Sequence, residues 1–288
     1  MGFKNLKAVN DAYDAGRVKF SSWRKQPTQT TASGIWFDLS MSPGNPVPNY
    51  YAAAPLEAKV LARSSDYGID HGGPVAPYTK HLKSLMAMTV TTTAVPLPMI
   101  LCDYLLYYPF VDMSVAGGEL QPMVNNASLT RYTDGLGVQI MPVEVASQIG
   151  GARFYVTYTN SDGVAGRVTP SVTCNTQVVN GTIITSASAT NGAAGPFLPL
   201  QNDDKGVRSI EGVTFLDGGD VGLITFVLVK PLATHCIHDI TAPAERDYCL
   251  DFPSMPQIKD DAYLNLICHP TGTLANAPIY GTAEFIWS

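Results

Sequence analysis

Charged residues are scarce in this chain of 288 residues. They make up 15% of it, whereas roughly 25% is usual for a globular protein. Hydrophobic residues account for 45%, but no continuous apolar run reaches the roughly 18 residues of a transmembrane helix, and the nearest one, 94–111, contains three prolines and an aspartate. We expect no contact with a membrane. A surface so poor in charge is typical of a protein that partners cover.

A disulfide framework is also not expected. The five cysteines are odd in number and have no regular spacing. The first residues, MGFKNLKAVNDAYDAG, lack the apolar segment of a secretory signal. These features favour a protein made in a reducing cytoplasm.

Motifs of catalysis are missing as well. No G-x-S-x-G nucleophile motif occurs, and neither His71 in IDHGGP nor His81 in YTKHLK lies in a recognisable catalytic sequence. The glycine-rich loops at Asp134 and Asp217 lack the lysine of a phosphate-binding loop. We expect no enzyme and no cofactor.

One group of residues suggests a metal. His235, Cys236 and His238 are followed by Cys249 and by the pair Cys268-His269, and thiolate and imidazole are good zinc ligands. The spacing fits no zinc motif, and on a strand His235 and His238 would point to opposite faces. Buried free cysteines beside hydrogen-bonded histidines are the simpler interpretation, so no metal is expected, with zinc as the alternative.

Positive charge is concentrated at the start of the chain. The first 25 residues have a net charge of +4, which leaves -10 for the rest because the total is -6. Nucleic-acid binding would need a larger basic field, so a nucleic-acid partner is not expected. We expect electrostatic contacts with an acidic neighbouring surface from Lys4, Lys7, Arg17, Arg24 and Lys25.

The pattern of residue types changes from helical spacing to short β-prone runs after the first residues. Apolar residues at helical spacing predict a helix over 3–15, ended by Gly16. Short β-prone runs with turn residues between them then predict a mainly β protein with a jelly-roll-like β-sandwich. The expected strands lie within 85–93, 98–108, 137–145, 152–159, 166–174, 176–186, 209–216, 221–229, 262–269 and 278–288.

Two local predictions are more specific. Asn180-Gly181 stands between two β-branched runs, which predicts a type I′ hairpin turn. The sequence PLEAKVLA, 55–62, predicts a second short helix.

The stretch GIWFDLSMSPGNPVPNYYAAAP, residues 34–55, is apolar and has four prolines. Three prolines within six residues forbid a regular strand ladder and favour extended polyproline-like backbone. We therefore predict an N-terminal helix and docking arm over 1–60, and a sandwich body over 61–288 that forms one sandwich or two. The expected contact residues of the arm are Trp36, Phe37, Met41, Pro43, Pro46, Pro48, Tyr50 and Tyr51.

The aromatic run CDYLLYYPF, residues 102–110, has two interpretations. Its rings could stack on sugars in a glycan-binding module. Aromatic side chains within an apolar segment are more often part of a core or a subunit contact, which is the interpretation we favour.

Long stretches of the sequence resemble a group of virion structural proteins of tailed bacteriophages. The similarity runs through RYTDGLGVQ, RFYVTYTNSDGVAGRVTPSV, GPFLPLQNDDKGVRSIEGVTFL and FVLVKPLAT, and WFDLSMSPGNPVPNYYAA is similar to their N-terminal part. It spans roughly residues 34 to 234 and contains no active-site motif. Residues 235–288 have no counterpart in it.

The resemblance implies a capsid decoration, or cement, protein on the virion surface, made in the host bacterial cytoplasm. Its implied partners are the major capsid protein and neighbouring copies of itself, as a homotrimer. Such a protein stabilises the lattice because it binds across joints that exist only in the assembled state. The alternatives are a tail or head-to-tail connector protein, and a glycan-binding module on the virion.

Overall fold

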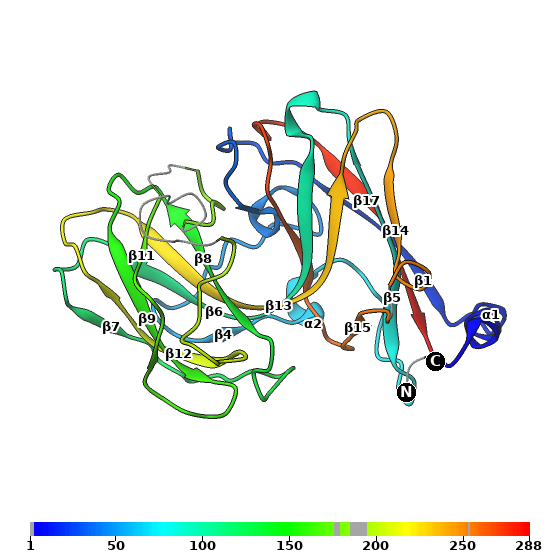
Figure 1. Cartoon of the computed structure of the whole chain (residues 1–288), viewed down its shortest axis with the longest axis horizontal. Coiled ribbons are helices and arrows are strands. Elements are labelled where there is room, and N and C mark those ends of the chain that lie inside the picture. The colour runs from blue at the N-terminus through cyan, green and yellow to red at the C-terminus, as the bar shows by residue number, and fades with distance from the viewer. Residues whose placement is uncertain (1–2, 176–178, 185–194, 253) are drawn as a thin grey trace.

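A computed structural model describes residues 3–175, 179–184, 195–252 and 254–288 (Figure 1). Helices are few and short: α1 (Leu6–Asp14), α2 (Arg63–Asp66), and the 3-10 turns η1 (Leu39–Met41) and η2 (Thr92–Ala94). No helix in the described part of the chain is long and apolar enough to cross a membrane. The strands are β1 (Val18–Lys25), β2 (Phe37–Asp38), β3 (Gly44–Asn45), β4 (Lys59–Val60), β5 (Lys80–Thr89), β6 (Leu97–Asp112), β7 (Leu120–Pro122), β8 (Gln139–Ala146), β9 (Arg153–Asn160), β10 (Arg167–Val168), β11 (Val172–Thr173), β12 (Val207–Phe215), β13 (Leu223–Ile237), β14 (Ala244–Asp247), β15 (Gln257–Ile258), β16 (Leu264–Cys268) and β17 (Ile279–Trp287).

These strands form three antiparallel sheets. The first has the order β14-β5-β17-β1-β3, with β15 also on β5. The central sheet has the order β2-β16-β6-β13-β8, with β4 also on β6. The third has the order β10-β9-β12-β7, with β11 also on β9. The predicted mainly β class and sandwich architecture are confirmed.

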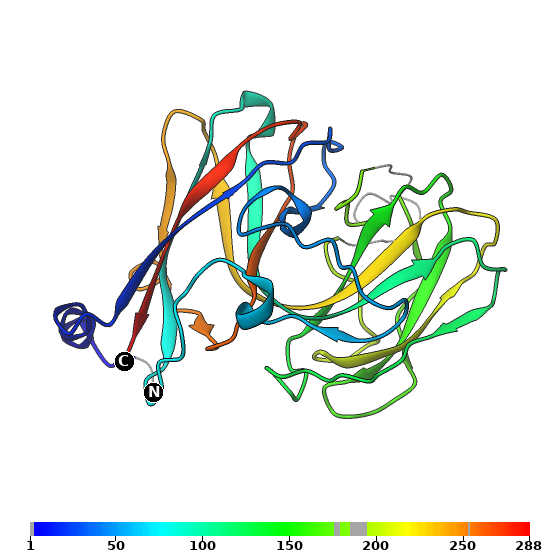
Figure 2. The ribbon, with the colours of Figure 1, turned by 180° about the vertical axis from the view of Figure 1, so that it is seen from behind.

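The long strands β6 and β13 tie two sandwiches together. Their pairing runs from Leu97 opposite Ile237 to Asp112 opposite Leu223, and Figures 1 and 2 show this ribbon passing from one lobe to the other. At one end it packs on the first sheet, in a core that includes Leu101. At the other end it packs on the third sheet, in a core that includes Phe226. The question of one sandwich or two is answered by two sandwiches with a shared central sheet.

The predicted N-terminal helix is present as α1. The Asn5 side chain accepts a hydrogen bond from the Ala8 amide at 2.9 Å and so caps its first turn. Gly16 follows with a φ of +67°, the left-handed conformation that glycine adopts without strain. Val9 and Ala12 are buried and pack with Ile286 of β17, which attaches the helix to the first sheet.

The expected boundary near residue 60 does not separate two parts of the structure. The strand β1, which the sequence did not predict, pairs along its whole length with β17, from Val18 opposite Ile286 to Lys25 opposite Ile279. The chain's first and last strands are therefore neighbours in one sheet. Part of the predicted arm, β1, is therefore a strand of the body from which the arm was expected to extend.

Two local predictions are wrong. Residues 55 and 56 form a turn, and β4 within 55–62 pairs with Tyr107 and Leu106 of β6, because pairing with a central strand outweighs weak helix propensity. At the Asn180-Gly181 turn only Gly181 has a positive φ, so the turn is not type I′, which needs it at both residues. The predicted first strand of that hairpin lies largely outside the described residues.

Candidate interface and buried polar sites

Segment 34–61 docks on the central sheet of its own chain. Neighbouring residues of β6 point to opposite faces: Leu101 belongs to the first core, whereas Cys102 belongs to a third cluster on the other face. Met41 and Tyr51 fill this third cluster, and Phe37 is buried in the first core. These three predicted contact residues are therefore not exposed for another chain, a correction that follows from the gain in burying large apolar side chains.

A buried carboxylate anchors this segment. Asp38 accepts hydrogen bonds from the hydroxyls of Ser40 at 2.6 Å and Tyr104 of β6 at 2.7 Å, and also from the Tyr51 hydroxyl. Burial raises the pKa of Asp38, and these hydroxyl donors oppose the rise. These hydrogen bonds join Asp38, Ser40 and Tyr51 of the segment to Tyr104 of the central sheet.

Lys25 is a second anchor and corrects another prediction. Its ammonium is buried and donates to the backbone carbonyls of Pro46 at 2.8 Å and Ser42 at 3.1 Å. Burial lowers its pKa to about 8, an effect that the Asp38 carboxylate opposes. Lys25 holds the proline-rich loop of its own chain and is not an electrostatic partner for a neighbour.

The rest of the segment remains at the surface. Pro43 and Val47 are exposed, and Tyr50 is 57% exposed beside the buried Tyr51. Trp36 is half-buried against His269, with ring centroids 5.1 Å apart. Of the other predicted contacts, Pro46 is buried and Pro48 half-buried.

Two hollows flank these exposed residues. One, of about 210 Å³, is lined by Pro27, Met41, Pro43 and Tyr50 among others. The other, of about 410 Å³, is lined by Val47 and by Tyr67, which is 66% exposed. The outer edge of the segment thus carries exposed aliphatic and aromatic groups between two concave surfaces.

The remaining predicted basic residues are spread over one sheet and its helix. Lys4 and Arg24 are exposed, and Arg24 donates to Gln26 at 2.6 Å. Lys7 forms an ion pair with Asp11 one helical turn away, at 2.8 Å. Arg17 is half-buried over the Tyr78 ring at 4.9 Å. The exposed Lys4, Lys7 and Arg24 keep the capacity for electrostatic contacts.

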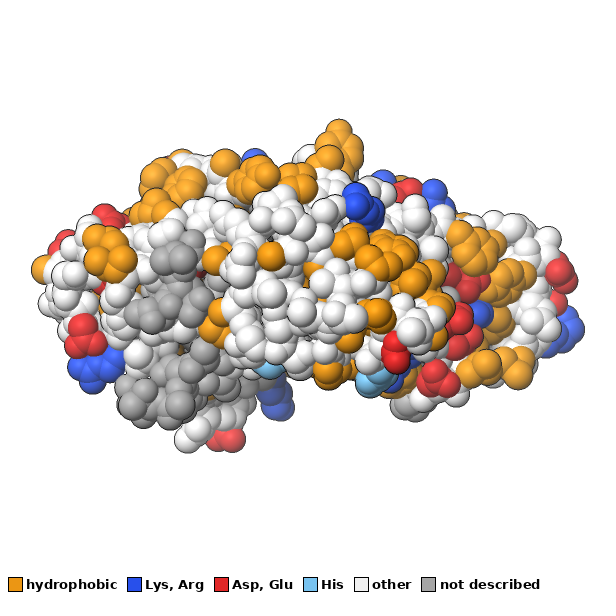
Figure 3. All heavy atoms as spheres, turned by 90° about the horizontal axis from the view of Figure 1, so that it is seen from above, with side chains coloured by type: hydrophobic (Ala, Val, Ile, Leu, Met, Phe, Trp, Pro, Cys, Tyr) orange, Lys and Arg blue, Asp and Glu red, His pale blue; other side chains and the backbone are white. Residues whose placement is uncertain are grey.

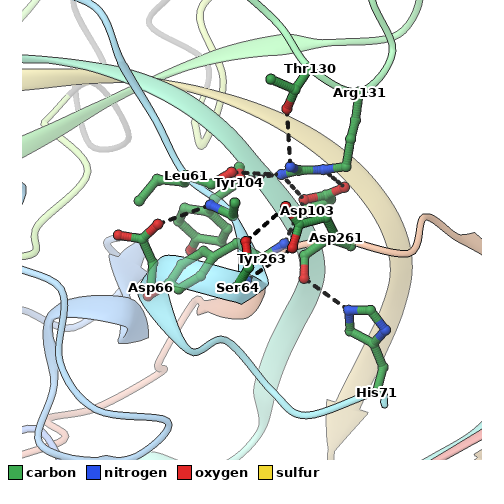
Figure 4. Close-up of polar contacts among 12 residues, drawn as sticks. Leu61, Ser64, Asp66, His71, Asp103, Tyr104, Thr130, Arg131, Asp261 and Tyr263 are labelled. Carbon is green, nitrogen blue, oxygen red and sulfur yellow. Dashed lines mark hydrogen bonds and ion pairs between the residues drawn. The ribbon is translucent and has the colours of Figure 1, made fainter. Parts of the chain in front are cut away.

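Figure 4 shows a buried ion pair between the lobes that the sequence analysis missed. Arg131 binds both oxygens of Asp103 on β6, at 2.8 and 3.0 Å, and donates to the carbonyl of Leu61 at 3.0 Å. The Asp103 carboxylate also accepts from the Tyr263 amide at 3.0 Å. Burial raises the pKa of Asp103 to about 6 despite the guanidinium, so the pair is ionised at neutral pH.

A second buried polar pair lies nearby. His71 has one ring nitrogen 3.0 Å from the Ala262 carbonyl, the contact drawn for His71 in Figure 4, and the other 3.0 Å from the Lys80 ammonium. Since a carbonyl only accepts and an ammonium only donates, His71 is the neutral tautomer with the proton on Nε2. Burial lowers its pKa to about 4. Both ring nitrogens of His71 are engaged within the fold, which fits a structural role.

The predicted zinc ligands do not converge. His235 is buried, and Cys236 lies 3.7 Å from the Nδ1 atom of His238. Among the residues that the structure describes, no three His, Cys, Asp or Glu side chains gather in a way that could hold a metal ion. Cys236, Cys249 and His269 are half-buried and His238 is exposed, and neither ring nitrogen of His235 has a hydrogen-bond partner among the described residues.

The aromatic run of β6 is internal, as the favoured interpretation expected. Tyr104, Tyr107 and Tyr108 are buried, and the Tyr108 hydroxyl donates to Asn125 at 2.6 Å. These rings are not accessible for stacking on a sugar.

The surface itself is weakly charged. In Figure 3 the middle of the face seen from above consists mostly of hydrophobic and uncharged polar atoms, and charged side chains are more frequent toward the two ends. The low charge of the surface could be predicted from composition alone. The pairing of Asp103 with Arg131 could not, because these residues are 28 positions apart in the chain.

A search of known protein families and of curated proteins finds no match to this sequence. Two solved structures are similar in a weak way. The VP2 subviral particle of infectious bursal disease virus has 9% identity and a TM-score of 0.19, over 94% of this chain and 81% of that one. A structure of the Gt strain of infectious bursal disease virus has 8% identity and a TM-score of 0.17, over the same shares. Scores this low do not establish a common fold, so function has to be inferred from the chain itself.

Proposed function

We propose that this protein is a structural protein of a phage virion that binds and stabilises the capsid lattice, as a decoration protein. The observation that carries the proposal is the outer edge of segment 34–61, where Val47 and Tyr50 are exposed while their neighbours are anchored. An exposed aromatic ring on a rigid segment is a good interface anchor, because little conformational entropy is lost when it binds.

Two further features support this function. The weakly charged surface suits extended contact with other subunits, and the resemblance to phage virion proteins includes the same segment. The buried groups Asp38, Asp103 and His71 each have partners within the fold. The proposal keeps Lys4, Lys7 and Arg24 as outlying electrostatic contacts to an acidic neighbour.

The interface is tested with surface substitutions, because removal of residues 1–55 would delete β1 and part of two cores. We expect Val47→Ser with Tyr50→Ala to weaken binding to capsids of the parent virus by about tenfold or more. The matched control is Val164→Ser, which replaces an exposed valine on the other lobe. Binding is measured by co-sedimentation at several protein concentrations.

Undiminished binding by the double variant would reject this edge as the interface. The oligomer is tested separately by light scattering, where a homotrimer has three times the 30.8 kDa of the chain. A larger closed ring would instead support a tail or connector protein. Saturable binding on a glycan array, without capsid binding, would support the glycan-recognition alternative.

A further inference from the structure

The side of β1 that faces away from β17 is mostly uncovered. The Trp287 amide donates to the Arg17 carbonyl at 3.2 Å, and the Gln26 amide donates to the Pro43 carbonyl, beside β3, at 2.9 Å. Because backbone groups alternate in direction along an antiparallel strand, the odd-numbered residues of β1 bond to β17 and the even-numbered ones point away from it. β3 pairs with only the last two residues of β1, the blue strand in Figure 2. No strand in the described part of the chain pairs with this side of residues 18–22.

This edge lacks the features that usually protect an edge strand. Proteins shield such edges with proline, a bulge or an unpaired charge. Residues 18–22 contain no proline, and their pairing with β17 has no bulge. Their one charged residue, Lys19, forms an ion pair with Asp70 at 2.9 Å. Phe20 is 63% exposed, and among the described residues no group bonds to the outward backbone groups of Val18 and Phe20.

A hollow lies next to this open edge. The hollow of about 410 Å³ is lined by Asn45 and Asp70 as well as by Val47. The Asn45 side chain donates to the Ser22 carbonyl at 3.0 Å, and the Asp70 carbonyl accepts from the Ser21 hydroxyl. These contacts place the hollow beside β1, at the point where β3 ends.

The hollow also contains a positive charge without a matching acid. Arg63 lines it and forms no salt bridge in the described part of the chain, and its buried Nε atom has no described hydrogen-bond partner. The nearby acids are engaged elsewhere, because Asp66 accepts from the Ala62 amide at 3.0 Å and Asp70 binds Lys19. A carboxylate is the natural partner of a guanidinium group.

We propose that the open edge of β1 and the adjoining hollow bind an extended, acidic segment of another polypeptide. The segment pairs with residues 18–22 as an added strand, and its residue opposite Ser21 points to the same face as Ser21, toward the hollow. A carboxylate there meets Arg63, and Val47 and Tyr67 contact the aliphatic part of the segment. Backbone hydrogen bonds supply affinity and the hollow supplies selectivity. In a virion the segment comes from a neighbouring subunit, an assignment that rests on the proposed function.

The first experiment presents the full chain with a displayed library of random twelve-residue peptides. We expect the enriched peptides to combine β-branched residues with at least one Asp or Glu. Their binding is then measured by fluorescence anisotropy, and it should weaken as NaCl is raised, because an ion pair that is partly exposed is screened by salt.

Two variants test the edge and the hollow separately. Phe20→Pro removes an outward amide without removing a bond to β17 and should lower peptide affinity at least tenfold, whereas Phe20→Thr keeps the amide and should lower it about fivefold at most. Arg63→Gln should lower affinity about tenfold or more. Its control is Lys205→Gln, which replaces an exposed cation two residues before β12 and should leave affinity unchanged.

Absence of enriched peptides, or enrichment of peptides without acidic residues, would overturn the proposal. Full affinity in Arg63→Gln would also overturn it, and this variant decides the question if Phe20→Pro does not fold.

Co-sedimentation with capsids of the parent virus separates this inference from the proposed function. Capsids that bind the wild type but not Arg63→Gln would support a neighbouring subunit as the source of the segment. Capsids that bind both equally would overturn that source. Capsids that bind neither, while the peptides still bind the wild type, would overturn the proposed function and support the peptide site alone.

Discussion

Asp103 and Glu144 are both buried in the central sheet, yet their surroundings differ. Asp103 in β6 has Arg131 across both oxygens and a backbone amide as a third donor. Glu144 in β8 has the uncharged Gln148 as its polar neighbour and forms no salt bridge in the described part of the chain. The first carboxylate is matched by a positive charge within the fold, and the second is not.

The difference follows from where each residue lies. Asp103 is in the middle of the ribbon, where Arg131 and the Tyr263 amide donate to it and the Leu61 carbonyl in turn accepts from Arg131. Glu144 is near the end of β8, where its described polar neighbour, Gln148, carries no charge. A buried acid beside a guanidinium stays ionised, whereas burial of an acid without a cation favours its protonated form.

The largest expected effect comes from breaking the matched pair. Asp103→Asn should lower the free energy of unfolding by about 3 to 5 kcal/mol, because it leaves the Arg131 charge buried without its counter-ion. Urea unfolding followed by circular dichroism measures this loss. Arg131→Met should act in the same direction, and the double variant should lose less than the sum of the two. Additive losses would contradict direct coupling between these side chains.

The unmatched carboxyl should show its effect through pH. The native pKa of Glu144 is raised to about 8, whereas an unfolded glutamate has about 4.3. Between these values the native state binds the extra proton, so its contribution makes stability fall as pH rises. One pKa unit corresponds to about 1.4 kcal/mol. As the pH rises from 5 to 9, the free energy of unfolding of the wild type should therefore fall by a few kcal/mol relative to that of Glu144→Gln.

The comparison is made in EDTA by urea unfolding at pH 5, 7 and 9. The stability difference between variant and wild type should grow across this series and level off above pH 8. A difference that stays constant with pH would mean that Glu144 titrates alike in both states.

A smaller effect is expected in the anchored segment. Tyr51→Phe removes the hydroxyl that donates to Asp38 and should lower stability by about 1 kcal/mol. The adjacent Tyr50→Phe is the matched control, since this exposed ring should change stability by less than about 0.5 kcal/mol. Equal losses in both variants would show that the Asp38 network does not stabilise the native state.

Much of the fold was predictable from local pattern. Runs such as 98–108 and 278–288 appear as β6 and β17, because β-branched and aromatic residues bounded by turn residues favour strands wherever the chain places them. The helix near the N-terminus was equally readable, since Val9 and Ala12 lie one turn apart and form its buried face.

The candidate site was predicted only in part. The sequence identified the unusual apolar segment, but it could not tell that Tyr51 points into the chain's own core while Tyr50 points outward. That choice depends on partners brought together by the fold: the Tyr51 hydroxyl donates to Asp38 and contacts the Ser40 hydroxyl, and Tyr104 of β6 also donates to Asp38. Lys25 was misassigned for the same reason, because the carbonyls that bind it come from residues 40–46.

The sequence by itself determined a β-rich chain with a weakly charged surface, a short N-terminal helix and no recognisable catalytic motif. These are local or compositional properties, and they need no knowledge of neighbours in space. Only the tertiary structure decided that β6 and β13 contribute to two cores, that segment 34–61 is half core and half surface, and that Asp103 meets Arg131 whereas Glu144 forms no salt bridge in the described part of the chain. Each of these depends on residues distant in the chain, and hydrophobic pattern carries no information about which distant groups will meet.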